Sequence, residues 1–210
     1  MKHEIIILAN SRKIGNRCIA GIDRRTGEWL RPCYGEGHEG IPCHVRQING
    51  QEPQLLDVVE ISMKSRGPNL EYQPENRYLS NKPWEKIGVV EAKHLFKYCE
   101  KGKFLLHNTD RRIHMDELLS LPAEDRKSLC LVKAHVNFFT ELDVYGRKRV
   151  NASFNFGSHE YCLQVTDYEY WSQFPAHETA KADCLLTISL GLPFEVDNCC
   201  YKLVAGVIEL

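Results

Sequence analysis

Short apolar runs separated by turn residues dominate the hydrophobic pattern of the N-terminal part of this chain. The segment EIIILA (4–9) is a continuous apolar run, and LLDVVEISM (55–63) is rich in β-branched residues. The runs RCIAGID (17–23) and EWLRP (28–32) flank a short loop that ends in glycine, which predicts a hairpin. This part of the chain is therefore expected to consist of β-strands.

The C-terminal part shows the same strand pattern more clearly. RVNASFNFGSHEYCLQVTD (149–167) alternates apolar and polar residues on both sides of a turn at Gly157, which is typical of a hairpin. A long apolar segment precedes it at 129–146, and two more follow at 183–194 and 201–210. Strands are therefore predicted for most of this part as well.

Helical spacing is confined to short segments. EAKHLFKYCEKG (91–102) spaces its apolar residues as a helix does and ends in glycine, and MDELLSLPAEDRKS (115–128) predicts a short helix or two. YEYWSQF (168–174) predicts another short helix, which Thr166 and Asp167 are expected to cap.

About nine strands in two clusters predict a mainly β fold with two small OB-like β-barrels packed together. Short helices are expected in the connecting segment and near residues 168–174. The expected organisation is a first barrel at 1–90, a helical or loop connection at 91–128, and a second barrel at 129–210. An exchange of strands between the two barrels, giving one compact unit, is an alternative.

Composition narrows the partners and the compartment. The formal net charge is −1, so no global field attracts the chain to nucleic acid or to a membrane surface. No apolar run reaches the ~18 residues of a membrane span, and the start lacks a signal-peptide core. The protein is therefore expected to be cytoplasmic, with no membrane partner and with its nine cysteines as thiols.

The stretch RPCYGEGHEGIPCH (31–44) contains the ligand types of a zinc site but not the spacing of one. Cys33 and Cys43 are separated by nine residues, whereas zinc knuckles separate their cysteines by about two to four. The side chains of the adjacent Cys43 and His44 would point in opposite directions in an extended segment. We therefore expect a glycine-rich surface loop, with His38 on it, and neither a metal nor a cofactor.

Motifs of catalysis are also missing from the sequence. It contains no G-x-S-x-G elbow, no phosphate-binding G-x-x-x-x-G-K-[ST] loop and no G-x-G-x-x-G. We therefore expect no catalytic residues and a protein that is not an enzyme.

Cations are concentrated near the first predicted hairpin, where six fall within residues 12–31. Loops of a barrel can gather such groups on one rim, beside an aromatic side chain that stacks on a base. Solvated surface loops carry similar charges, so this alternative stays open. The expected nucleic-acid contacts are Asn10, Arg12, Lys13, Arg17, Arg24, Arg25, Trp29 and Arg31, with a possible extension through Arg111, Arg112, Arg147, Lys148 and Arg149.

Six blocks resemble, in order, the dual OB-containing domain proteins: 9–32, 55–63, 73–79, 82–88, 153–167 and 189–210. They include ANSRKIGNRCIAGIDRRTGEWLRP, QPENRYL and SLGLPFEVDNCCYKLVAGVIEL, whereas 33–54 and 91–128 resemble the family little. The resemblance implies two OB-type barrels in one compact unit. It also implies nucleic-acid binding, frequent occurrence in bacterial and phage conflict systems, and no known catalytic residue.

Within the QPEN block, Gln73, Glu75 and Asn76 have two possible roles. They would line a pocket and hydrogen-bond a base edge, or they would brace a loop between the barrels. The sequence does not decide between these roles.

The leading hypothesis is a non-catalytic module that binds nucleic acid or a nucleotide, with single strands favoured. One alternative is a protein-interaction adaptor that works beside an effector protein in a conflict system. A second alternative is a small-ligand or nucleotide-processing enzyme with a pocket between the barrels.

Overall fold

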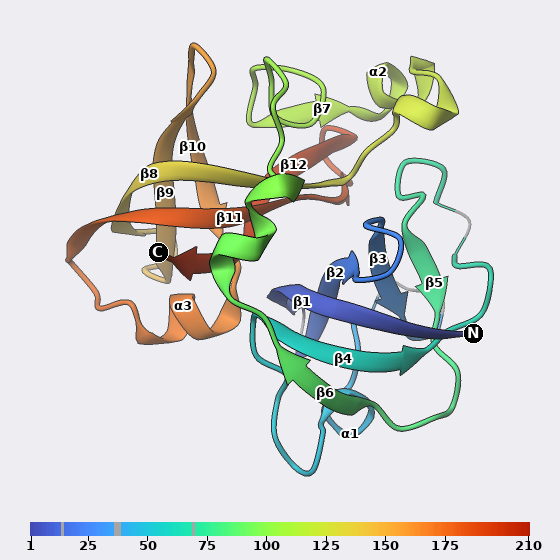
Figure 1. Ribbon diagram of the computed structural model, residues 1–210. Coiled ribbons are helices and arrows are strands. Elements are labelled where there is room, and N and C mark those ends of the chain that lie inside the picture. Colours follow the sequence, from blue (N-terminus) through green and yellow to red (C-terminus); the bar gives the residue numbers. More distant parts are fainter. Residues whose placement is uncertain (14, 36–38, 69) are drawn as a thin grey trace. The chain divides into compact units, whose positions relative to one another are not determined.

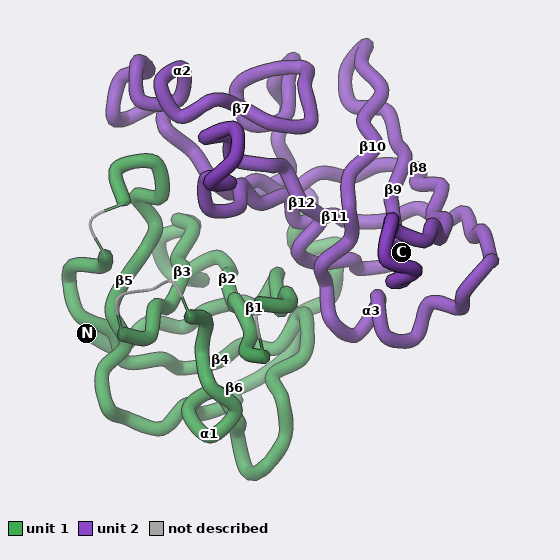
Figure 2. The backbone as a smooth tube through the Cα atoms, turned by 180° about the vertical axis from the view of Figure 1, so that it is seen from behind, with its two compact units in different colours: residues 1–95 green, residues 96–210 purple. Residues whose placement is uncertain are grey.

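The computed structural model describes all residues except 14, 36–38 and 69, so His38 lies outside the described residues. The chain divides into two compact units, Met1–Leu95 and Phe96–Leu210 (Figure 2). Each unit is built mainly from β-strands, as the hydrophobic pattern predicts (Figure 1).

The first unit is a curved sheet in which the edge strand β5 comes back to the end of β4. Its strand order is β5-β3-β2-β1-β4-β6, and β3 and β5 run parallel. Beyond the ends of β4 and β5, the Lys64 amide donates to the Tyr78 carbonyl at 2.8 Å and Ser80 N donates to Ser62 O at 2.9 Å. The strands are β1 (Lys2–Lys13), β2 (Asn16–Asp23), β3 (Trp29–Cys33), β4 (Asp57–Ser62), β5 (Asn76–Tyr78) and β6 (Glu85–Val89).

The second unit contains a closed five-stranded barrel. Its order is β10-β9-β8-β11-β12, and β10 closes the ring by pairing in parallel with β12 at Gln164–Leu203 and Val165–Val204. A short strand, β7, adds to β12 next to this closure. The strands are β7 (Arg112–His114), β8 (Leu129–Leu142), β9 (Lys148–Phe156), β10 (His159–Val165), β11 (Thr179–Phe194) and β12 (Cys199–Glu209).

The two units share one strand topology. In each, the first five barrel strands in chain order neighbour one another as 1-2-3-5-4, with the third and fifth parallel. This is the arrangement of a small Greek-key barrel of the OB type. The predicted fold of two OB-like barrels is therefore confirmed.

The helices are few and short. They are α1 (Cys43–Arg46), α2 (Met115–Ser120) and α3 (Tyr168–Gln173), with 3₁₀ turns η1 (Ala92–Tyr98) and η2 (Ala123–Asp125). Asp167 caps α3 by accepting hydrogen bonds from the amides of Glu169 at 3.1 Å and Tyr170 at 3.2 Å, which confirms its predicted role. No helix in the described residues is long and apolar enough to cross a membrane.

Residues 91–128 are part of the units themselves rather than a separable connection. Leu105 and Leu118 are fully buried, and β7 pairs with β12. The division between the units falls after Leu95, inside η1. Removal of 91–128 would therefore take core side chains out of the second unit.

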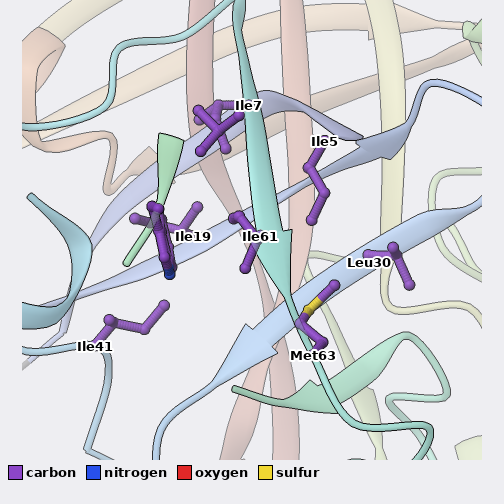
Figure 3. Packing of buried hydrophobic residues seen from close by; sticks show 9 residues of the cluster. Ile5, Ile7, Ile19, Leu30, Ile41, Ile61 and Met63 are labelled. Carbon is purple, nitrogen blue, oxygen red and sulfur yellow. The ribbon is translucent and has the colours of Figure 1, made fainter. Parts of the chain in front are cut away.

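Alternation along the strands separates core from surface in the first unit. The core cluster contains side chains from β1, β2, β3 and β4, including Ile5, Ile7, Ile19, Leu30 and Ile61 (Figure 3). Ile41 also belongs to this cluster, so the segment expected to be only a surface loop contributes to the core through its C-terminal end. Because successive strand residues point to opposite faces, Arg31 must lie on the outer side of β3 next to the inward Leu30.

Candidate nucleic-acid interface

Three of the predicted cations lie together at the tip of the β1–β2 hairpin. Arg12 and Lys13 end β1, and Arg17 is the direct cross-strand partner of Arg12. Asn10 lies further back on β1, where its amide donates to the Pro53 carbonyl at 3.0 Å. The tip is therefore positively charged, while Asn10 has a structural contact.

The other predicted contacts of the hairpin lie at its opposite end. Arg24 donates its backbone amide to the Glu4 carbonyl at 2.8 Å, and the Arg25 guanidinium donates to the Lys2 carbonyl at 3.0 Å. Trp29 begins β3 beside this turn and pairs with Ile22. The aromatic side chain expected to stack on a base is therefore not next to the hairpin tip.

Strand length decides whether these two groups can form one patch. Arg24 hydrogen-bonds Glu4 near the start of β1, and Arg12 lies eight residues further along this strand, so at ~3.3 Å per residue the two groups are roughly 26 Å apart. This separation is several times the screening length of about 8 Å at physiological salt. The expected single basic patch of residues 12–31 is therefore divided into two remote groups.

Arg31 is not available to a phosphate. The residue is 5% exposed, and its guanidinium pairs with Glu75 at 2.9 Å between Nη2 and Oε1. Its backbone amide also donates to the Glu75 carbonyl at 3.0 Å. Contact with a ligand would require the separation of this buried pair, so the expected phosphate contact does not fit this placement.

The QPEN block lies beside β3 in the first barrel, where Asn76 begins β5 and pairs with Arg31. Gln73, Glu75 and Asn76 are all buried, as is the neighbouring Tyr72. The Asn76 amide donates to Gln73 Oε1 at 3.0 Å. Of the two roles left open by the sequence, these contacts favour bracing over an open pocket, and the bracing is within the first unit.

The equivalent face of the second barrel is open. A hollow of about 820 Å³ crosses β9, β10 and β12, which are the second, third and fifth strands of this barrel. Oligonucleotides bind to OB barrels on the face of the second and third strands. Side chains around the hollow, called the groove below, include Arg111, Arg149, Asn151, Gln164, Phe194 and Tyr201.

A hydrogen-bond network fixes the aromatic end of this groove. The Tyr201 hydroxyl donates to Asp197 Oδ2 at 2.8 Å and accepts from Arg112 Nη1 at 2.8 Å. The Phe194 ring meets the Tyr201 ring edge-on, with centroids 6.3 Å apart. Two ordered rings therefore lie at one end of the groove.

Carboxylates share the groove with the cations. Asp110, Glu141 and Glu160 line it, and Glu141 accepts a hydrogen bond from the Asn151 amide at 3.0 Å. Arg149 lies 3.5 Å from Asp143, measured from Nη2 to Oδ2. The groove is therefore polar and close to neutral, not a strongly basic channel.

A buried lysine supports the wall of the groove. Lys202 is 2% exposed, and its ammonium donates to the carbonyl and the side-chain oxygen of Asn108 at 2.7 and 2.8 Å. Burial lowers the pKa of Lys202 to about 8. The ammonium also lies 5.4 Å from the centroid of the Tyr161 ring. Through its hydrogen bonds to Asn108, Lys202 ties the 104–111 segment to the barrel.

The sequence profile of the dual OB-containing domain family matches residues 3–207. The chain belongs to this family. Among curated proteins, none matches it significantly. A solved structure described as the crystal structure of p204 HINb domain aligns with 99% of this chain and 98% of that chain, at 8% identity and a TM-score of 0.33. That likeness is too low to carry an argument about fold or function.

In this dual OB-containing chain, the described residues first considered for zinc, Cys33, Cys43 and His44, are not arranged as ligands. Within the described residues, no group of three or more His, Cys, Asp or Glu side chains could hold a metal ion. Cys43 and His44 are exposed on α1, whereas Cys33 is buried. Burial raises the pKa of the Cys33 thiol to about 12, so this sulfur stays protonated.

The sequence indicated part of this groove but not its position. Arg111 and Arg149 appeared there only as a possible extension of the basic cluster at 12–31. Lys202 looked like an ordinary strand residue, since only the position of Asn108 shows why a lysine is buried. Phe194 and Tyr201 carried no distinct signal, because aromatic residues are common in strands.

Proposed function

We propose that this protein is a non-catalytic module that binds single-stranded nucleic acid in the groove of its second barrel. The observation that carries the proposal is the open hollow across β9, β10 and β12 in a member of the dual OB-containing domain family. In the first barrel, Arg31 of β3 is instead buried against Glu75 of the QPEN block. Binding therefore moves from the first barrel, where the sequence alone placed it, to the second.

The side chains around the groove suit a single strand. Arg111 and Arg149 would contact phosphates, and Tyr201 and Phe194 offer rings on which unpaired bases stack. The Gln164 amide in the lining can donate to and accept from a base edge. Bases in a duplex are already stacked, so these rings favour a single strand.

The mixed charge of the groove predicts a weak dependence on salt. Two phosphate contacts to a single strand give a slope of about −1.4 for log K against log [salt], at about −0.7 per phosphate. Stacking then supplies much of the affinity, at about 1–3 kcal/mol per base. A steep slope would instead indicate binding at the basic hairpin tip.

Several buried thiols support a non-catalytic role. Burial raises the pKa of Cys130, Cys184 and Cys200 to about 12 in each case. A thiol must ionise to act as a nucleophile, so these three cysteines are poor candidates for covalent catalysis.

The test measures fluorescence anisotropy of labelled single-stranded DNA and RNA oligonucleotides over a range of salt concentrations. The Arg111→Ala/Arg149→Ala variant is expected to bind more weakly and to lose about 1.4 from the slope. Lys101→Ala, an exposed lysine of the same unit, is the matched control. Unchanged binding by the double variant, together with loss of binding in Arg12→Ala/Lys13→Ala/Arg17→Ala, would place the interface on the first barrel instead.

Exposed apolar side chains favour the adaptor function as a second candidate. Val144 and Tyr145 are adjacent at the β8–β9 turn and are 92% and 78% exposed. Isolated exposed apolar residues are common, but two adjacent ones at a turn suit a protein contact. Serine at both positions is expected to weaken co-purification with a host protein and to leave oligonucleotide binding intact.

A further inference from the structure

A second hollow lies in the first unit, at the C-terminal end of β3. Its volume is about 820 Å³, within the range of small-ligand pockets in proteins. It is formed by the end of β3, helix α1, the end of β5 and the segment that follows β5. Its polar and aromatic lining comprises Tyr34, His44, Lys64, Tyr78, Asn81 and Lys82, which we call the tyrosine–lysine pocket.

In the part of the chain that the structure describes, the two lysines of this pocket lack the carboxylate partner that several other cations of the first unit have. Within the described residues, neither Lys64 nor Lys82 forms an ion pair. Six cations elsewhere on this unit pair with carboxylates, namely Lys2, Arg24, Arg31, Arg46, Lys86 and Lys93. The described lining of the pocket also contains no Asp or Glu. The two ammonium groups are therefore available to an anionic ligand.

Aromatic walls accompany these charges. Tyr78 is half-buried on β5, and the Lys64 ammonium lies 5.7 Å from the centroid of its ring. Tyr34 follows β3 and exposes about a third of its surface, 37%. Such a pair of rings offers flat apolar surface beside positive charge, which matches a ligand that combines an aromatic ring with an anion.

We propose that the tyrosine–lysine pocket binds a nucleoside phosphate, either free or at the end of a nucleic-acid strand. The base stacks on Tyr34 or Tyr78, and the phosphate lies between the ammonium groups of Lys64 and Lys82. Asn81 and Ser80 offer hydrogen bonds to the sugar or the base edge. This site lies in the other unit from the groove, so the inference goes beyond the proposed function and does not depend on it.

The first arm of the test uses free ligands. Isothermal titration calorimetry compares the four ribonucleoside 5′-monophosphates with the corresponding nucleosides and with inorganic phosphate. Lys64→Ala/Lys82→Ala is expected to weaken monophosphate binding about tenfold or more for each ammonium removed. Tyr34→Ala is expected to weaken binding of the monophosphate but not of inorganic phosphate, since only the base stacks.

The second arm uses one oligonucleotide with and without a 5′-phosphate. Tighter binding of the phosphorylated form, lost in Lys64→Ala/Lys82→Ala, identifies a strand end as the ligand. The Arg111→Ala/Arg149→Ala variant separates this effect from binding in the groove, because it should leave the preference for the phosphate intact. Lys93→Ala is the control, as an exposed lysine of the same unit outside the pocket.

Two results would overturn the inference. One is the absence of binding by monophosphates together with equal binding of the two oligonucleotides. The other is binding that Lys64→Ala/Lys82→Ala leaves unchanged, while the thermal unfolding midpoint shows that the variant is folded. Both lysines are on the surface, so the substitutions should not prevent folding.

Discussion

Replacement of Asp167 by alanine removes three hydrogen bonds from one buried carboxylate. The side chain accepts from the amides of Glu169 and Tyr170 at the start of α3 through Oδ1. Its Oδ2 accepts from the Val207 amide of β12 at 2.9 Å. The residue is 3% exposed, so water cannot easily replace these contacts.

The magnitude follows from the two kinds of contact. Loss of a helix N-cap costs about 0.5–2 kcal/mol. A buried amide left without an acceptor, here that of Val207, costs about 1–3 kcal/mol. Asp167→Ala should therefore lower the free energy of unfolding of the second unit by about 2–4 kcal/mol. Asp167→Asn keeps one cap oxygen and should recover part of this loss.

Urea denaturation, followed by far-UV circular dichroism and tryptophan fluorescence, tests this expectation. Trp171 lies on α3 in the second unit, while Trp29 and Trp84 report on the first. Variants that retain Trp171 alone separate the two transitions. A loss below about 0.5 kcal/mol for alanine, the usual range of a surface substitution, would refute the reasoning. Equal losses for alanine and asparagine would refute the assigned cap.

Three further changes have defined outcomes. Arg31→Ala should cost about 3–5 kcal/mol in urea denaturation, because it leaves Glu75 charged and buried. Gly21→Ala should destabilise the first unit by about 1–3 kcal/mol or more, since a Cβ there would lie 2.0 Å from the Ile6 carbonyl oxygen. Burial raises the pKa of Asp167 from 3.8 to about 6. Between pH 3.8 and about 6, the folded state therefore binds a proton that the unfolded state has released. The stability of the wild type relative to Asp167→Asn should therefore fall as the pH rises from about 4 to about 6, and a flat difference would contradict the shift.

The division of the basic cluster has a consequence for binding experiments. Arg12 and Arg17 are at one end of the β1–β2 hairpin and Arg24 and Arg25 at the other. A combined substitution of all these residues would change two separate surfaces at once. Separate variants of each end are therefore needed to assign an effect on nucleic-acid binding.

The local sequence was sufficient to predict many strands and helices, because the residue patterns that indicate them extend over only a few residues. Alternation around Gly157 predicted the β9–β10 hairpin, and the polar Asp167 before YEYWSQF predicted the cap of α3. The division into two β-rich parts followed from the clustering of the strands. The topology that makes each part an OB barrel came from the family resemblance, since pairing between distant strands is not visible in a local pattern.

Candidate site residues were less predictable because availability depends on distant neighbours. Arg31 looked like Arg12 in the sequence, yet it is buried because Glu75 and Tyr72 cover β3. Tyr34 and Lys82 are far apart in the chain and had no signal of their own, but they line one hollow. Burial and pairing of charges are set by these long-range contacts.

The sequence by itself determined the strand-rich composition, the two-part organisation and the absence of recognised catalytic motifs. Each of these three properties depends on residue types and on spacings between residues that are close together in the sequence. Only the tertiary structure decided which face of each barrel is open. In the first barrel Arg31 of β3 is buried against Glu75 of the QPEN block, and in the second a hollow crosses β9, β10 and β12. The physical reason is that a surface is open only where no other segment packs against it. Packing between segments that are far apart in the chain leaves no local pattern in the sequence.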